Sequence, residues 1–122
     1  MNGMEHLEGC REALGEISSY NRLLDELRRT EPRDLDSILQ AQKDLRAARL
    51  RYVRALGKSV EAMAGMPEAQ RAVLWQAYVL GKSNTRIADC LHFARRSVVR
   101  LKKAGKEWLE ERAEQAGSAQ GV

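Results

Sequence analysis

The sequence predicts an all-α protein in which two long helices precede a group of shorter ones. Apolar residues recur at spacings of three and four along most of the chain, as they do on one face of a helix. Proline, which interrupts helices, occurs only twice in 122 residues. With 43% hydrophobic and 31% charged residues, the chain has a globular composition, and its length suits one domain with a modest core.

Residues 4–29 form the first predicted helix. Its apolar stripe consists of Leu7, Cys10, Leu14, Ile17, Leu24 and Leu27. Either Tyr20 or Asn21 completes the stripe. A strict seven-residue register selects Asn21, whose buried amide could fix a pairing register, whereas the simpler arrangement places Tyr20 inside and is the one we expect. The helix ends at residues 30–32, because the ring of Pro32 cannot continue it.

The second predicted helix covers residues 34–64 and begins at a cap formed by Asp34 or Asp36. Its expected buried side consists of Leu35, Ile38, Leu45, Tyr52, Leu56, Val60 and Met63, and it is interrupted by Gln42 and Arg49. At ~1.5 Å per residue the helix is about 45 Å long, so its stripe needs partners. The first helix, folded back in an antiparallel hairpin, is the nearest partner. A second protomer is the next, and we expect a homodimer formed through the hairpin, residues 1–65.

Residues 66–114 form a second unit after a short hinge at residues 65–67. A helix over residues 68–80 ends at Gly81, Ser83 caps a helix over residues 84–91, and a third helix starts near Arg95 after a tight break. The expected buried residues are Val73, Leu74, Ala77, Tyr78, Ile87, Ala88, Leu91, Val98, Leu101, Gly105 and Trp108. Two short helices joined by such a turn form a helix-turn-helix pattern. Residues 115–122 are predicted to be a disordered tail.

Charge is concentrated in this second unit. Between Lys82 and Lys106 there are eight basic residues and one acidic residue, Asp89, and the whole chain has a net charge of +4. An anionic partner is therefore expected, and the helix-turn-helix spacing favours double-stranded DNA over an ordinary solvated basic face. The residues expected to face base edges are Arg95, Arg96, Val99, Arg100 and Lys103. The residues expected to contact phosphates are Lys82, Ser83, Asn84, Thr85 and Arg86.

The same stretch resembles region 4 of bacterial sigma factors, and more loosely the regulators that share this module. The matching residues are Met66, Pro67, Gln70, Arg71, Val73, Leu74, Tyr78, Val79, Gly81, Ser83, Ile87, Ala88, Leu91, Ser97, Val98 and Leu109. The resemblance implies promoter recognition and contact with RNA polymerase, and the overall architecture is similar to small regulators encoded by phages and prophages. Three positions depart from the family pattern: Arg86 replaces a capping glutamate, His92 a turn glycine, and Ala94 a capping serine.

No catalytic constellation is present, so we expect no enzyme activity, cofactor or metal site. Cys90 and His92 could supply two metal ligands, but no further pair completes a site, and Cys90 is expected in the core. We expect a cytoplasmic protein without membrane contact, because the two cysteines are isolated and the sequence shows neither a signal peptide nor a long apolar run. The alternative functions are a protein-interaction adaptor and a phage DNA-packaging subunit, which a ring-shaped oligomer would favour.

Overall fold

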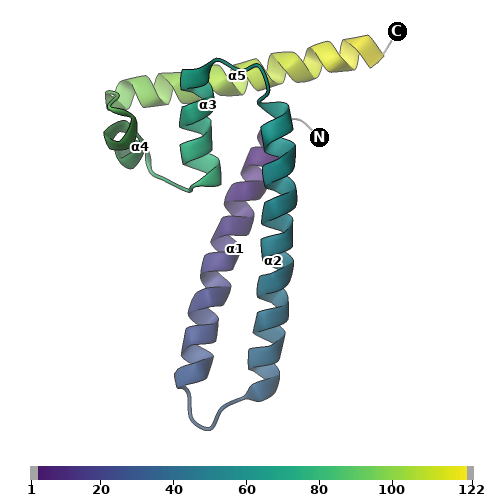
Figure 1. Cartoon of the computed structure of the whole chain (residues 1–122), viewed down its shortest axis with the longest axis vertical. Coiled ribbons are helices and arrows are strands. Elements are labelled where there is room, and N and C mark those ends of the chain that lie inside the picture. Colours follow the sequence, from purple (N-terminus) through teal and green to yellow (C-terminus); the bar gives the residue numbers. More distant parts are fainter. Residues whose placement is uncertain (1–2, 121–122) are drawn as a thin grey trace.

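The computed structural model describes the backbone of residues 3–120 and the side chains of residues 3–115. Over this part of the chain every regular element is helical, which confirms the all-α prediction (Figure 1). In chain order the elements are α1 (Gly3–Arg29), α2 (Leu35–Ala62), α3 (Glu68–Leu74), the π-helix η1 (Trp75–Val79), α4 (Asn84–Leu91) and α5 (Arg95–Gln120).

Helices α1 and α2 lie side by side and run in opposite directions, and α5 crosses the end of this pair where α3, η1 and α4 also gather (Figure 1). The connection between α1 and α2 is short, and Asp34 caps α2. Its carboxylate accepts hydrogen bonds from the backbone N–H of Ser37 at 3.1 Å and from the Ser37 hydroxyl at 2.6 Å. Of the two caps that the sequence allows, Asp34 is therefore the one used.

The main core lies where the start of α1 meets the short helices and α5. Its buried apolar side chains are Met4, Leu7, Cys10, Met63, Met66, Val73, Leu74, Ala77, Tyr78, Val79, Ile87, Ala88, Val98 and Leu109. A smaller cluster of Leu24, Ala41 and Leu45 lies further along the α1–α2 pair, with Tyr20 packed against it. Asn21 is exposed, so the prediction that Tyr20 completes the α1 stripe is confirmed.

The buried side of α2 differs from the sequence prediction. Leu35 and Val60, which were expected to be buried, are 66% and 51% exposed, while the small residues Ala41, Ala48 and Ser59 are buried instead. Small side chains allow the backbones of two helices to approach closely, so the contact with α1 follows these positions. The hydroxyl of Ser59 is satisfied in this interface, because it donates to the carbonyl of Ala55 at 2.7 Å.

A π-helical turn interrupts the helix that the sequence predicts over residues 68–80. The N–H of Leu80 bonds to the carbonyl of Trp75, five residues earlier, at 3.1 Å. The wider turn buries three consecutive side chains, those of Ala77, Tyr78 and Val79. The carbonyl of Val79 accepts a hydrogen bond from the Tyr52 hydroxyl of α2 at 2.8 Å, which ties the turn to the long helix pair.

The hinge and the C-terminal helix also differ from expectation. The guanidinium of Arg112 donates to the carbonyl of Ala64 and lies 5.1 Å from the ring centre of Trp108, so α5 holds the segment after α2 in place. Helix α5 continues past Glu114, the predicted end, to Gln120. The backbone of residues 115–120 is thus helical where a disordered tail was predicted, and residues 121–122 of that tail lie outside the described residues.

Candidate nucleic-acid interface

Helix α4 begins and ends at residues whose local chemistry fixes it. Ser83 caps its start, with the hydroxyl oxygen accepting from the N–H of Arg86 at 3.3 Å. His92 ends it in the left-handed conformation, at φ 57° and ψ 40°, and its N–H bonds to the carbonyl of Ala88. Because a left-handed conformation is unfavourable for residues with a Cβ atom, His92 carries backbone strain where glycine would carry none. The cap at Ser83 confirms the sequence prediction for the start of this helix.

Helix α5 starts three residues later and packs against both α4 and α3. The carbonyl of Ala94 accepts hydrogen bonds from the N–H groups of Ser97 and Val98, at 3.0 and 3.1 Å. Val98 is fully buried, and Gly105 lies so close to α3 that an added Cβ atom would be 2.7 Å from Cδ1 of Leu74. These contacts fix the rotation of α5 about its own axis, and therefore determine which of its side chains face solvent.

The side of α5 that faces away from these contacts is basic. We name it the α5 basic face, and it consists of Arg95, Arg96, Val99, Arg100 and Lys103, all of them exposed. Val99 is 54% exposed and is the apolar member of the face. The structure thus brings together on one surface all five residues that the sequence predicts for base contacts.

The α5 basic face has a defined end. Glu107, Glu110 and Glu114 continue the same side of the helix beyond Lys103 at spacings of three and four, and they are exposed. A polyanion can therefore follow the first turns of α5 but is repelled by the later ones. This change of sign limits the favourable surface to the part of α5 nearest the α4–α5 turn.

The five residues predicted to contact phosphates lie together at the start of α4, but their side chains differ in exposure and in whether they already take part in other contacts. Thr85 and Arg86 are exposed, and the exposed Ser83 uses its hydroxyl oxygen as the helix cap. The Asn84 side-chain oxygen accepts from the Lys102 ammonium at 2.9 Å, and Lys82 Nζ lies 3.6 Å from the sulfur of Cys90. Thr85 and Arg86 are thus the side chains that remain most open to a phosphate.

Two basic residues outside the predicted set add to this surface. Arg11 of α1 and Lys106 of α5 lie 5.7 and 5.8 Å from the ring centre of Tyr78, which holds both cations against the buried aromatic ring. Burial, and then the charges of Lys106 and Arg11, lower the pKa of Lys102. Arg11 could not be found from the sequence, because it is more than sixty residues away from the basic stretch and nothing local indicates that α1 approaches α5.

Cys90 is exposed on α4, so the prediction that it is a core residue is wrong. Its position on the helix lies beside the buried line of Ile87 and Ala88 rather than on it. Within the described residues, no three His, Cys, Asp or Glu side chains gather in a way that could hold a metal ion. None of the helices in residues 3–120 has both the length and the apolar character needed to cross a membrane.

Comparison of the chain with protein-family models, with curated proteins and with solved structures finds no match.

Proposed function

We propose that this protein binds double-stranded DNA sequence-specifically in the cytoplasm and thereby regulates transcription, with α4 and α5 acting as a helix-turn-helix. The observation that carries the proposal is the α5 basic face: three arginines, a lysine and an exposed valine on the first turns of a helix whose opposite side is fixed in the core. A helix of this kind fits the major groove of B-form DNA, and its N-terminal residues then reach base edges.

The residue types on this face match the donors and acceptors of the major groove. Arg96 and Arg100 can each donate two hydrogen bonds to the O6 and N7 atoms of guanine, and Val99 offers an apolar contact to the methyl group of thymine. The acidic residues from Glu107 onward favour an approach in which the N-terminal end of α5 enters the groove and the helix then leaves the DNA. Phosphates on one side of the groove would then lie near Thr85 and Arg86.

The regulatory part of the proposal depends on the resemblance to sigma factor region 4. In that family the module reads promoter DNA and contacts RNA polymerase, and we propose the same pair of partners here. The departures at Arg86, His92 and Ala94 concern the cap and turn residues of the motif. They leave the basic face intact, so the protein is expected to bind DNA while reading its own preferred sequence.

The direct test is to select bound sites from a random duplex library and to measure binding to the enriched site. Arg96→Ala and Arg100→Ala are each expected to weaken binding by ~1–3 kcal/mol on that site and to relax specificity at one position. Arg22→Ala is the matched control, because it removes the same charge from an exposed position on α1, away from α4 and α5. It should leave binding to the enriched site nearly unchanged.

Two outcomes would contradict the assignment. If the arginine variants bind the selected site as well as the wild type does, then α5 does not read the bases. If the wild type selects no sequence and does not bind duplex DNA at all, the basic surface serves an acidic protein partner, as in the adaptor alternative. A ring-shaped oligomer would favour the DNA-packaging alternative.

A further inference from the structure

Helix α2 has a second apolar side that nothing in the described chain covers. Its members, which we name the α2 outer stripe, are Leu35, Leu39, Leu50, Val53 and Val60, with exposures of 66%, 61%, 50%, 60% and 51%. By helical geometry this stripe lies about a third of a turn around α2 from the residues that pack on α1, such as Leu45 and Ser59. Large apolar side chains aligned along one side of a helix are typical of a helix-packing surface.

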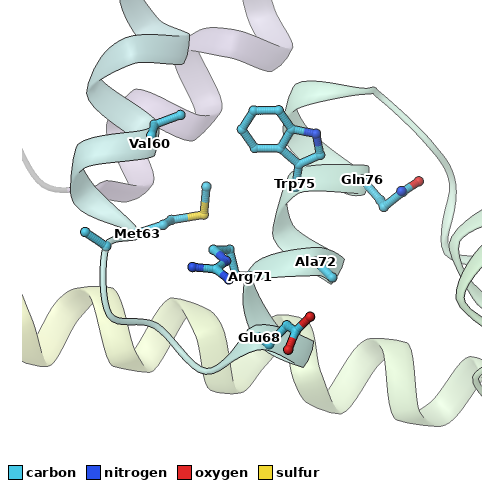
Figure 2. Close-up of a pocket in the computed structure, with 8 residues that line it drawn as sticks. Val60, Met63, Glu68, Arg71, Ala72, Trp75 and Gln76 are labelled. Atoms are coloured by element: carbon cyan, nitrogen blue, oxygen red, sulfur yellow. The ribbon is translucent and has the colours of Figure 1, made fainter.

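One end of the α2 outer stripe leads into a groove between α2 and α3. The groove has a volume of about 640 Å³. Figure 2 shows Val60 and Met63 of the α2 side facing Trp75 across it, with Arg71 at its floor and Glu68 and Ala72 further along α3. Its lining is largely apolar, and a leucine side chain is small enough to enter it.

A second, antiparallel copy of α2 centred on the peptide bond between Arg49 and Leu50 would pair positions that lie at equal distances on either side of that bond. Leu39 and Val60 are equally far from this bond, as are Arg46 and Val53, and Leu35 and Ala64. Gln42 and Gly57 form a further such pair. In each pair a longer side chain on one half of the helix corresponds to a shorter one on the other half. Arg49 and Leu50 form the central pair of the same arrangement.

We propose that two copies of the chain associate through antiparallel contact of their α2 outer stripes, with a two-fold axis near Leu50. The Leu35 and Leu39 side chains of each copy then lie over the groove of the other, beside Ala64 and Val60. Such an interface is isologous and closes at two copies. Arg49 and Leu50 lie equally near the axis, and Leu50 packs beside its own equivalent in the second copy.

Charge at the two ends of the interface is complementary. Asp34 and Asp36 flank Leu35 at the start of α2, and the groove in which the same leucine would be placed is lined by one cation, Arg71, and by one carboxylate, Glu68, which lies further along α3. Within the described residues neither Asp36 nor Arg71 forms an ion pair of its own. The association therefore brings an exposed carboxylate of one copy to an exposed guanidinium of the other.

Arg46 and Arg49 oppose association, because both lie near the two-fold axis and their positive charges in the two copies are brought close together. Their aliphatic stems can pack on the neighbouring apolar residues while the guanidinium groups remain in water. A face about 44 Å long and ~10 Å wide has roughly 450 Å² per copy, or roughly 900 Å² for the pair, which is below the ~1,200–2,000 Å² of standard specific interfaces and in the range of weaker associations. The walls of the groove add further area at each end.

The test uses the full chain without DNA, so that its failure and the failure of DNA binding are distinguishable. Sedimentation at micromolar concentrations is expected to show a dimer. Leu50→Lys should weaken the dimer at least tenfold, because each dimer loses two buried leucines and gains two charges. Arg46→Leu should strengthen it, since a leucine then faces Val53 of the second copy. Leu23→Lys is the control, because it places the same charge at an exposed leucine of α1 outside the stripe.

A cysteine cross-link reports the geometry independently of the affinity. In a Cys90→Ser background, Leu50→Cys is expected to form an intermolecular disulfide, because residues beside a two-fold axis approach their own equivalents. Leu23→Cys should not form one. A monomer throughout the concentration range would overturn the proposal, and so would a dimer that dissociates equally with both lysine variants or forms no disulfide at position 50.

Discussion

Replacing Gly105 with alanine tests whether the contact between α3 and α5 positions the α5 basic face. The new Cβ atom would lie 2.7 Å from Cδ1 and 3.1 Å from Cγ of Leu74, both closer than ordinary van der Waals contact. Leu74 is fully buried, so a shift of its side chain must be taken up by the surrounding core. Overpacking of this kind costs about 1–3 kcal/mol, and the higher helix propensity of alanine offsets about 1 kcal/mol of it. We therefore expect a net loss of roughly 1 kcal/mol in the free energy of unfolding.

Thermal unfolding at a fixed protein concentration measures this loss, with Gly15→Ala as the matched control. Gly15 is in α1 with no atom within 4 Å of its added Cβ, so that variant should be stabilised by roughly 0.5–1 kcal/mol. Leu74→Ala alone should lower the free energy of unfolding by about 2–5 kcal/mol. In that background Gly105→Ala should cause no further loss, because the Leu74 atoms with which the new Cβ atom clashes are absent. If Gly105→Ala stabilises the protein as much as Gly15→Ala does, the close approach of α5 to α3 is wrong.

Three further predictions concern the turn, the π-helix and the phosphate side of the interface. His92→Gly should raise the free energy of unfolding by about 1 kcal/mol in a thermal melt, because glycine adopts the left-handed conformation without strain. Burial raises the pKa of Tyr52, so above pH ~10 its phenol ionises more readily in the unfolded chain than in the folded protein, and the free energy of unfolding should fall. Tyr52→Phe should reduce that fall in pH-dependent melts. Lys82→Ala should weaken binding to all duplexes about equally and flatten its salt dependence in a binding titration.

Most of the helices and several of their ends could be predicted from the sequence because local residues determine them. Pro32, Gly81 and Ser83 act within one helical turn, through a missing donor, a positive φ and a side-chain cap respectively. The apolar stripe of α1 was also readable, since its period is that of an α-helix. For the same reason the five residues of the α5 basic face could be placed on one side of one helix.

Features that depend on contacts between distant segments could not be predicted in this way. The π-helix at Trp75–Val79 is accompanied by a hydrogen bond from Tyr52, and no local pattern records that contact. The buried side of α2 follows small residues such as Ala48, which carry little hydropathy signal, so the larger Leu35 and Val60 were wrongly assigned to it. Arg11 lies beside Tyr78 because α1, far away in the sequence, packs against both η1 and α5.

The salt dependence of binding to duplex DNA distinguishes a DNA-binding surface from an ordinary solvated basic face. If the α5 basic face and the start of α4 contact phosphates and bases, the logarithm of the binding constant should fall linearly with the logarithm of the salt concentration. The slope should be about −0.9 for each phosphate contact. Combining Arg96→Ala and Arg100→Ala should lower the affinity, whereas Arg22→Ala should change neither affinity nor slope. An affinity that is independent of salt, or equally reduced by Arg22→Ala, would contradict the account.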